Sequence, residues 1–139
     1  MPNSAVASDA LPSPAGAVPS SAAEILQRAT RMPVIQVTST LRIEPGHVYV
    51  IAPNLHMSMI DSMLIVEDLE RPRGQHVAID LFFRTLAGVH RERSIAILLS
   101  GTGSDGAVGI TRDKEQGGVT IVQSPGDAEH EGMPAAAIR

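Results

Sequence analysis

The sequence of 139 residues contains no cysteine, no tryptophan, one tyrosine and two phenylalanines. Without cysteine the protein can form neither disulfide bonds nor thiolate metal sites, it has no cysteine nucleophile, and it fits a reducing compartment. With so few aromatic rings, the core has to be built from aliphatic side chains and the six methionines.

A basic patch and a long apolar run are absent as well. The formal net charge is −4, with both signs scattered along the chain, whereas a nucleic-acid partner would require clustered basic side chains and usually stacking aromatics. No stretch of about 18 consecutive apolar residues exists, so we predict no membrane span. The N-terminal residues lack the basic start and apolar block of a signal peptide. These features predict a soluble, cytoplasmic protein that binds no nucleic acid.

The first 20 residues differ in composition from the rest of the chain. They are mainly proline, serine and alanine, and such a segment buries too little apolar surface to offset the entropy lost on ordering. We therefore predict a disordered tail over residues 1–20. The remaining residues, 21–139, have a length typical of one folded domain.

The first half of this domain predicts one helix followed by strands. The helix is expected over residues 22–29, after a serine cap. Extended segments and turn signals then predict a strand and an antiparallel meander. The expected strands cover residues 48–51, 57–60 and 63–66, and residues 67–76 are expected to form a surface loop.

The second half alternates helices and strands. Apolar residues at spacings of three and four predict a helix over residues 79–89, and residues 94–100 are apolar on both faces, as in a central parallel strand. A helix over residues 107–115 and a strand over residues 119–123 follow, and a last helix opens at Met133. This order predicts an α/β fold with a mostly parallel sheet and right-handed crossovers, beside the antiparallel meander.

Residues 98–109, LLSGTGSDGAVG, place glycines and a carboxylate directly after an apolar strand. The segment from Gly101 to Gly106 matches G-x-G-x-x-G between a strand and a helix. Because glycine amides at a helix start attract phosphate, a nucleotide site is one interpretation. Asp105 would, however, direct a negative charge towards that phosphate, and only 33 residues follow Gly106, too few to complete a dinucleotide fold.

Two further interpretations of Asp105 are open at this point. An aspartate at the carboxyl end of a central strand lies where α/β enzymes collect functional groups, and it could orient a histidine in a hydrolytic site. It could equally cap the helix that starts near Ala107. Ser104 resembles the nucleophile of a G-x-S-x-G elbow, but the first glycine of that motif is missing. We therefore interpret Ser104 as a turn residue.

The histidines form no metal-ligand pattern. No two have helical ligand spacing, so we predict hydrogen-bonding or surface roles, no metal site and no cofactor. The five are His47, His56, His76, His90 and His130. His56 is the most notable because it closely follows the strand predicted at 48–51. The methionines at positions 57, 59 and 63 are interpreted as core filling.

Several stretches resemble the chemotaxis receptor methylesterases, the CheB-type protein-glutamate methylesterases. Besides LLSGTGSDGAVG, the stretches PGHVYVIAPNLHM, IDLFFRTLA, GGVTIVQSP and GMPAAAI occur in the family's order and at roughly its spacings. The segment ILQRATRMPV resembles the one before the family's hairpin. The likeness covers about residues 21–139, and the wording of IDLFFRTLA and GTGSDG is closest to methylesterase domains fused to a receptor methyltransferase.

This resemblance implies a doubly wound α/β sheet with an inserted antiparallel hairpin. It also implies hydrolysis of γ-glutamyl methyl esters on chemoreceptors, with release of methanol, by a Ser–His–Asp triad without a cofactor. By motif match, Asp105 is the implied triad aspartate, and Thr102 and Gly103 are implied to line the active site. Met133 and Pro134 are implied to lie in a nearby structural loop.

The sequence departs from the family at the other two triad positions. No residues match the family's G-x-S-x-G-G turn or its histidine in a Gln-His context, so the resemblance implies a domain truncated at its N-terminal strands. We expect little or no esterase activity from this chain alone. Loss of the first strand would expose one side of the sheet and favour association.

The expected partners follow from the same resemblance. They are a methylated chemoreceptor as protein substrate and, in addition, a chain carrying the missing serine and histidine or a receptor methyltransferase domain. The alternative is a non-catalytic interaction module derived from the same domain.

Overall fold

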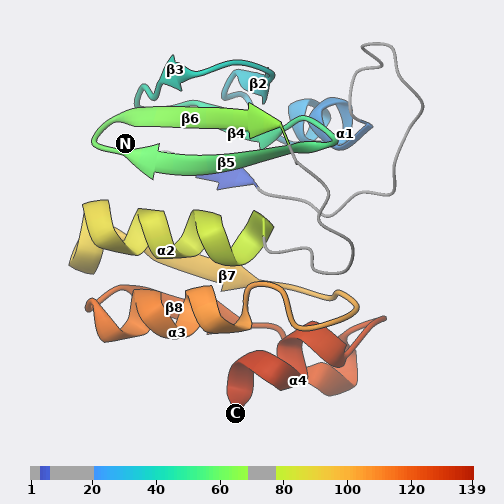
Figure 1. Ribbon diagram of the computed structural model, residues 1–139. Helices are drawn as coiled ribbons and strands as arrows, with labels where there is room; N and C mark the ends of the chain where they lie inside the picture. The colour runs from blue at the N-terminus through green and yellow to red at the C-terminus, as the bar shows by residue number, and fades with distance from the viewer. Residues whose placement is uncertain (1–3, 7–20, 69–77) are drawn as a thin grey trace.

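The computed structural model describes residues 4–6, 21–68 and 78–139 (Figure 1). Within these residues the strands form three small sheets, two of them parallel and one antiparallel. The predicted α/β class, with parallel strands and an antiparallel hairpin, is confirmed.

The first sheet has three parallel strands in the order β1-β4-β2. The central strand, β4 (Val48–Ile51), is a run of β-branched and aromatic residues, all of them buried. It is flanked by β1 (Ser4–Val6) and β2 (Val34–Val37). The predicted strand over residues 48–51 is confirmed. The predicted disorder of residues 1–20 is wrong for Ser4–Val6, because these residues pair with β4; the rest of that segment lies outside the described residues.

Helix α1 (Ser21–Ala29) confirms the helix expected over residues 22–29. The side chain of Gln27 joins it to the start of β2: Oε1 accepts a hydrogen bond from Val34 N (2.9 Å), and Nε2 donates to Met32 O (3.1 Å). These two bonds fix the turn that the chain makes between helix and strand.

The second sheet is antiparallel, with the order β3-β6-β5. The hairpin of β5 (Leu55–Ile60) and β6 (Met63–Asp68) confirms the predicted meander. It is longer than expected, so Glu67 and Asp68 belong to β6 and not to the surface loop; the loop's remaining residues lie outside the described part. The two-residue strand β3 (Leu41–Arg42) was not predicted. Met57 and Met59 are buried, as core filling requires, whereas Met63 is only half-buried.

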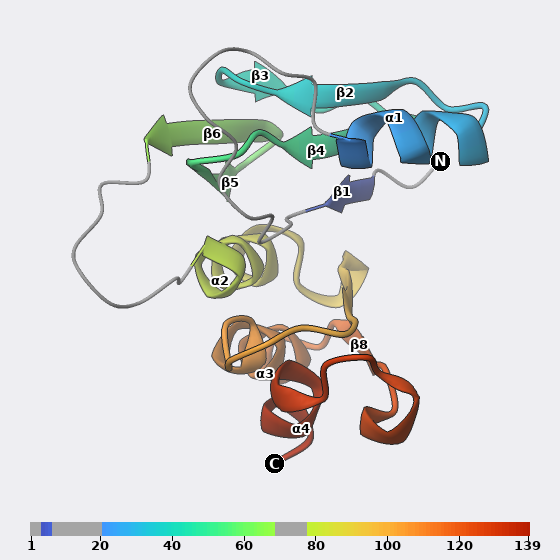
Figure 2. The ribbon, with the colours of Figure 1, turned by 90° about the vertical axis from the view of Figure 1, so that its right-hand side faces the viewer.

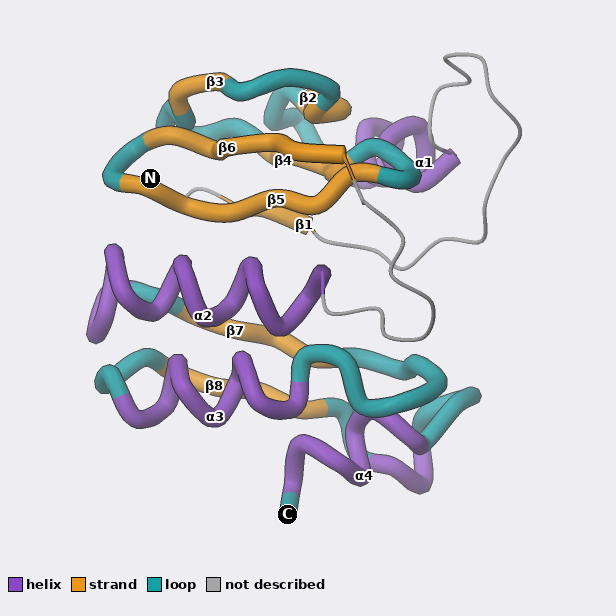
Figure 3. Tube along the Cα trace, in the orientation of Figure 1, coloured by secondary structure: helices purple, strands orange, loops and turns teal. Residues whose placement is uncertain are grey.

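Helix α2 (Ala78–His90) lies between the hairpin and the C-terminal elements (Figures 1 and 3). It buries Phe82 and Phe83 in the core that it shares with the hairpin. Its Thr85 hydroxyl accepts a hydrogen bond from Met59 N at 2.9 Å. The helix predicted over residues 79–89 is confirmed.

The third sheet consists of the parallel strands β7 and β8. The chain runs from α2 through the short turn η1 into β7, crosses over by α3, and continues from β8 through η2 into α4, which confirms the expected alternation. The bounds are η1 (Arg91–Arg93), β7 (Ile95–Leu98), α3 (Ala107–Glu115), β8 (Val119–Val122), η2 (Pro125–Asp127) and α4 (Gly132–Ile138).

Strand β7 differs from the expected central strand in its burial. Ala96 and Leu98 are buried, whereas Ile95 and Ile97 are 61 % and 53 % exposed. Among the described residues β7 pairs with β8 alone. The prediction of burial on both faces is therefore wrong for this chain, because the described elements cover only one face.

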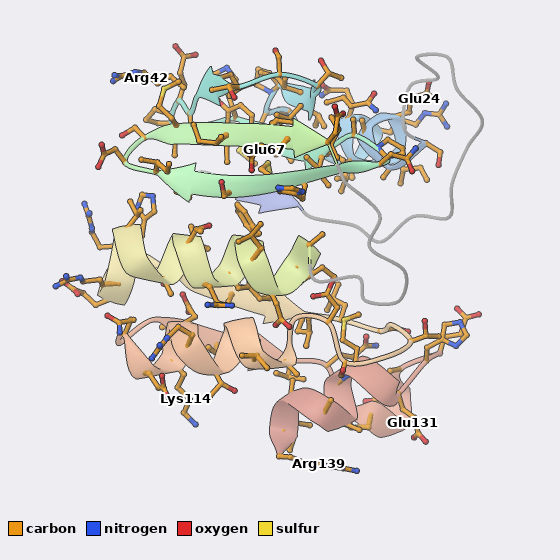
Figure 4. All side chains as sticks on the ribbon, in the orientation of Figure 1. Glu24, Arg42, Glu67, Lys114, Glu131 and Arg139 are labelled. Atoms are coloured by element: carbon orange, nitrogen blue, oxygen red, sulfur yellow. The ribbon has the colours of Figure 1, made fainter. Side chains whose placement is uncertain are left out.

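Charged side chains lie at the periphery of these elements. Figure 4 shows Arg42 on β3, Lys114 on α3 and Arg139 at the C-terminus pointing away from the packed layers, and all three are exposed. None of the helices in the described part of the chain combines the length and the apolar character needed to cross a bilayer.

Candidate active site

The loop between β7 and α3 is fixed against the segment that leads into α4. Gly101 N donates a hydrogen bond to His130 O, and Met133 N donates to Gly101 O, both at 3.0 Å. Ser100 Oγ accepts a further bond from His130 N at 2.8 Å. The carboxyl end of β7 therefore has a defined main-chain position.

Asp105 lies at the end of this loop and is 9 % exposed. Its Oδ1 accepts a hydrogen bond from Asp80 N at 2.9 Å, and its Oδ2 accepts one from Ile79 N at 3.1 Å. These amides belong to the first turn of α2, where a carboxylate satisfies unpaired N–H groups and meets the positive end of the helix dipole. Asp105 is thus a cap, but of a helix that begins more than twenty residues earlier in the chain.

The expectation that Asp105 would cap α3 is wrong. The N-cap of α3 is Gly106, which makes no side-chain hydrogen bond and has φ +93°. That left-handed conformation suits glycine. It turns the chain between Asp105 and α3, so the carboxylate points to the neighbouring helix instead of its own.

A second aspartate completes the junction between the two helices. Asp80, in the first turn of α2, accepts a hydrogen bond from Gly109 N in the first turn of α3, at 2.7 Å. The turn before α3 therefore caps α2, and α2 in return caps α3. Sequence analysis missed this exchange, although an acidic residue in a first helical turn is a signal for such a role.

The exchange holds α2 and α3 close together at Gly109. A Cβ atom at this position would lie 2.7 Å from Phe83 Cβ and 2.9 Å from Asp80 O. Only a residue without a side chain permits this approach. The position of Asp105 consequently depends on two helices packed at their N-terminal ends.

Thr102, Gly103 and Ser104 form the exposed part of the same turn. Ser104 O accepts a hydrogen bond from Ala107 N at 3.1 Å, which is consistent with a turn residue. Thr102, Gly103 and Asp105 thus share one turn at the carboxyl end of β7, the position where α/β folds place functional groups.

The resemblance implied that Met133 and Pro134 lie in a loop, but the structure places them in a helix. Both lie in the first turn of α4 and both are buried. Met133 reaches the turn through its amide bond to Gly101 O. The first turn of α4 therefore holds the start of the β7–α3 loop through this hydrogen bond.

The histidines described by the structure have other partners. His56 Nε2 lies 3.0 Å from Glu67 Oε2, in an open groove of about 860 Å³ between β5, β6 and the residues 38–40. His47 Nδ1 lies 3.0 Å from Pro45 O.

His90 ends α2, where burial and then the charge of Arg93 lower its pKa below 6.5. His130 meets the loop through its main chain, and His76 lies outside the described residues.

Metal-binding side chains are not gathered in the described part of the chain, which contains no group of three or more histidine, aspartate or glutamate side chains with suitable spacing. Two amides at the start of α3, where a phosphate would bind, already have acceptors. Ala107 N donates to Ser104 O, and Gly109 N donates to the carboxylate of Asp80.

The structure places a buried aspartate after a parallel strand of an α/β fold, with an exposed glycine turn beside it, at the sheet edge where α/β domains bind their ligands. Residues 13–139 match the family model described as CheB methylesterase. This match covers most of the chain, which therefore belongs to the CheB methylesterase family.

The chain is also similar to individual proteins, two of which carry the methylesterase name. The chain is 31 % identical over 121 residues to a protein-glutamate methylesterase/protein-glutamine glutaminase of Photorhabdus laumondii, covering 84 % of this chain and 35 % of the relative. It is 34 % identical over 115 residues to a putative protein of the same name from Leptospira interrogans, covering 82 % of this chain and 60 % of the relative. An uncharacterized 104.1 kDa protein of Rhodobacter capsulatus is 38 % identical over 116 residues, 84 % of this chain and 12 % of that protein.

A solved structure supports the fold. The crystal structure of the Thermotoga maritima CheB methylesterase catalytic domain superposes with a TM-score of 0.73 at 23 % identity, covering 85 % of this chain and 65 % of that domain. The chain therefore spans only part of the proteins that it matches, between about an eighth and two thirds of their length.

Proposed function

We propose that this chain supplies the aspartate-bearing part of a protein-glutamate methylesterase site. The observation that carries the proposal is the fixed carboxylate of Asp105, held by two amides of α2 at the carboxyl end of β7. A carboxylate held in this way can orient an imidazole and stabilise its cation, which is the task of the aspartate in a Ser–His–Asp mechanism.

The proposed reaction is acyl transfer from a methylated glutamate side chain to water. A serine hydroxyl attacks the ester carbonyl while a histidine takes its proton, methanol leaves with a proton from that histidine, and water then releases the glutamate by the same steps. In this chain Asp105 would support the histidine, and Thr102 and Gly103 would line the space for the ester. No motif in this sequence matches the serine or the histidine, so both are assigned to another segment or chain.

The proposed protein substrate is a methylated chemoreceptor. The proposed partner is a polypeptide that carries the serine and histidine, or a receptor methyltransferase domain beside it. The large Rhodobacter capsulatus relative, of which this chain matches 12 %, has room for such further domains. A non-catalytic interaction module is the alternative, and it predicts the same surfaces without hydrolysis.

Methanol release from methylated receptor membranes tests the proposal. The chain alone is expected to show no release above background. A mixture with a methylesterase segment that carries the serine and histidine is expected to release methanol, and Asp105→Ala in this chain should abolish that gain. Ser104→Ala, an exposed change in the same turn, should not.

Hydrolysis by the chain alone, or a gain that survives Asp105→Ala, would contradict the proposed role. Nucleotide binding through residues 101–106 has no comparable structural support, because Ala107 N and Gly109 N at the start of α3 already have acceptors. A thermal-shift titration with NAD or ATP is expected to give no stabilisation.

A further inference from the structure

Asp80 contacts both ends of the segment that leads from Asp105 into α3. Its main-chain N–H donates a hydrogen bond to Asp105 Oδ1 at 2.9 Å, and its carboxylate accepts one from Gly109 N at 2.7 Å. One residue of α2 therefore holds this short segment at two points. Figures 1 and 2 show α2 and α3 side by side, with their first turns at the same end of the molecule.

The bond from Gly109 N to the Asp80 carboxylate is one that α3 cannot replace from within. Gly109 lies in the first turn of α3, where main-chain N–H groups have no partner inside the helix. The N-cap of α3 is Gly106, which has no side chain that could accept a hydrogen bond. The acceptor therefore comes from α2, and an ionised acceptor makes a stronger bond than a neutral one.

The turn of the candidate site has an anchor on each side. At its start, the main chain of Gly101 is bonded to the segment that leads into α4. At its end, Asp105 and Gly109 are both bonded to Asp80. Residues 102–104, between these two anchors, are exposed. The direction of the Asp105 carboxylate consequently depends on the anchor at Asp80 as well as on the one at Gly101.

We propose that Asp80 is a positioning residue for the methylesterase reaction. The inference rests on the proposed function, in which Asp105 orients a histidine that another segment or chain supplies. An aspartate in that role must hold the imidazole in one tautomer and one direction. The bond between Asp80 and Gly109 keeps the turn that carries Asp105 against α2, and so keeps the carboxylate in that direction. Asp80 acts through Asp105 and contacts neither the ester nor the histidine.

Removal of the Asp80 side chain should lower the turnover and leave the affinity for the receptor unchanged. In Asp80→Ala, Gly109 N loses its acceptor and α2 and α3 lose one of their links, so Asp105 can shift relative to the histidine. Small displacements of a group that positions reacting atoms are costly. We expect kcat for methanol release to fall by about 10- to 100-fold, with KM changed by less than about two-fold.

Asp80→Asn separates the hydrogen bond from the charge. Its side-chain oxygen can still accept from Gly109 N, so kcat should stay within about three-fold of the parent value. Gln27→Ala is the matched control, because Gln27 in α1 likewise accepts a hydrogen bond from a main-chain amide, Val34 N. This change should weaken the fold and leave kcat unchanged.

Initial rates of methanol release test the inference. They are measured over a range of concentrations of methylated receptor membranes, with the full chain in saturating excess over a methylesterase segment that carries the serine and the histidine. The inference is overturned if Asp80→Ala keeps the parent kcat or changes only KM. It is also overturned if Asp80→Asn or Gln27→Ala loses as much of kcat as Asp80→Ala does.

These outcomes leave the proposed function in place as long as the parent mixture is active and Asp105→Ala abolishes that activity. A parent mixture without activity, or one whose activity survives Asp105→Ala, contradicts the proposed function and removes the basis of this inference with it.

Amide hydrogen exchange of the full chain gives a second readout that needs no reconstitution. The amides of Ile79 and Asp80 donate to Asp105, so their exchange reports whether the carboxylate keeps its place. Asp80→Ala is expected to speed exchange of the Ile79 amide by at least about ten-fold, and Asp80→Asn to leave it near the parent rate. An unchanged rate in Asp80→Ala would show that Asp105 is held without the Asp80 side chain, and would overturn the inference.

Discussion

Asp113 is fully buried in α3, and its Oδ2 has no hydrogen-bond partner among the described residues. Its Oδ1 lies 2.5 Å from Ser94 Oγ, and the same hydroxyl lies 2.6 Å from Arg91 O. A serine hydroxyl has one proton and can donate to only one of these acceptors. The site therefore brings together more acceptors than donors, in a place that water does not reach.

Replacing this carboxylate by an amide should stabilise the fold. In Asp113→Asn the side-chain NH₂ can donate to Ser94 Oγ, which leaves the serine proton for Arg91 O. We expect the free energy of unfolding to rise by about 1 kcal/mol, measured as a higher urea midpoint. Asp127→Asn, an exposed change of the same kind, should leave the midpoint unchanged. A lower midpoint for Asp113→Asn would show that the carboxylate has a favourable role here.

His90 gives the stability of the fold a pH dependence. Burial and the charge of Arg93 lower its pKa from 6.5 in the folded state. The unfolded chain therefore binds this proton more readily, so the contribution of His90 to stability is present above the unfolded pKa and is lost as the pH falls through 6.5 towards the lower folded value.

The measurement compares the urea midpoint at about pH 7.5 and about pH 5.5 in the parent and in His90→Gln, so that other titrating groups cancel. The parent is expected to lose more stability on acidification than the variant. An equal loss, or a larger loss in His90→Gln, would be inconsistent with the lowered pKa.

At the scale of elements, the close approach of α2 and α3 depends on Gly109. In Gly109→Ala the new Cβ would overlap Phe83 and the Asp80 carbonyl, so the helices would have to separate. We expect a net loss of about 1–3 kcal/mol in the free energy of unfolding. Gly88→Ala is the matched control in α2, because a Cβ there meets nothing within 4 Å. This change should raise the stability by up to about 1 kcal/mol through helix propensity.

Urea denaturation of both glycine variants provides the measurement. A Gly109→Ala protein as stable as Gly88→Ala would mean that the helix junction is looser than the structure describes. The same junction holds the amides of Ile79 and Asp80 that bind Asp105. Separation of the helices in Gly109→Ala is therefore expected to loosen Asp105 as well.

The elements that could be predicted from the sequence are those with local signals. Helices at 21–29, 78–90 and 107–115 follow from apolar spacing and end signals, and the β5–β6 hairpin follows from β-branched runs around a turn. Strand β1 could not be predicted, because a run of three residues in a segment of mainly proline, serine and alanine is too short for a local signal, and its order depends on pairing with β4. The predicted burial of both faces of β7 failed because covering a face depends on what packs against it.

The candidate site was predictable in part. The sequence indicated that Asp105 stands in a turn after a strand, and it left open whether the aspartate caps a helix. It could not indicate which helix is capped, because the bonds from Asp105 to Ile79 and Asp80 join residues about 25 positions apart. The hydrogen bond that Gly109 N donates to the Asp80 carboxylate is equally long-range. Such contacts follow from the packing of α2 on α3 and not from either segment alone.

At the scale of the whole molecule, the chain covers part of a family domain, with an ordered aspartate-bearing turn and an uncovered sheet face. The turn belongs to the β7–α3–β8 unit, in which the described elements leave the face of β7 with Ile95 and Ile97 exposed.

The most direct test of the account is the rate of methanol release by a chimera. In the Photorhabdus laumondii relative, the matched region is replaced by the corresponding residues of this chain, so that the serine and histidine come from the relative. Asp105→Ala is expected to lower kcat/KM by about 10³- to 10⁴-fold, whereas Ser104→Ala should change it by less than about two-fold. An active chimera that keeps its rate after Asp105→Ala, or a folded chimera without activity, would contradict the claim that this chain carries the working aspartate of a methylesterase site.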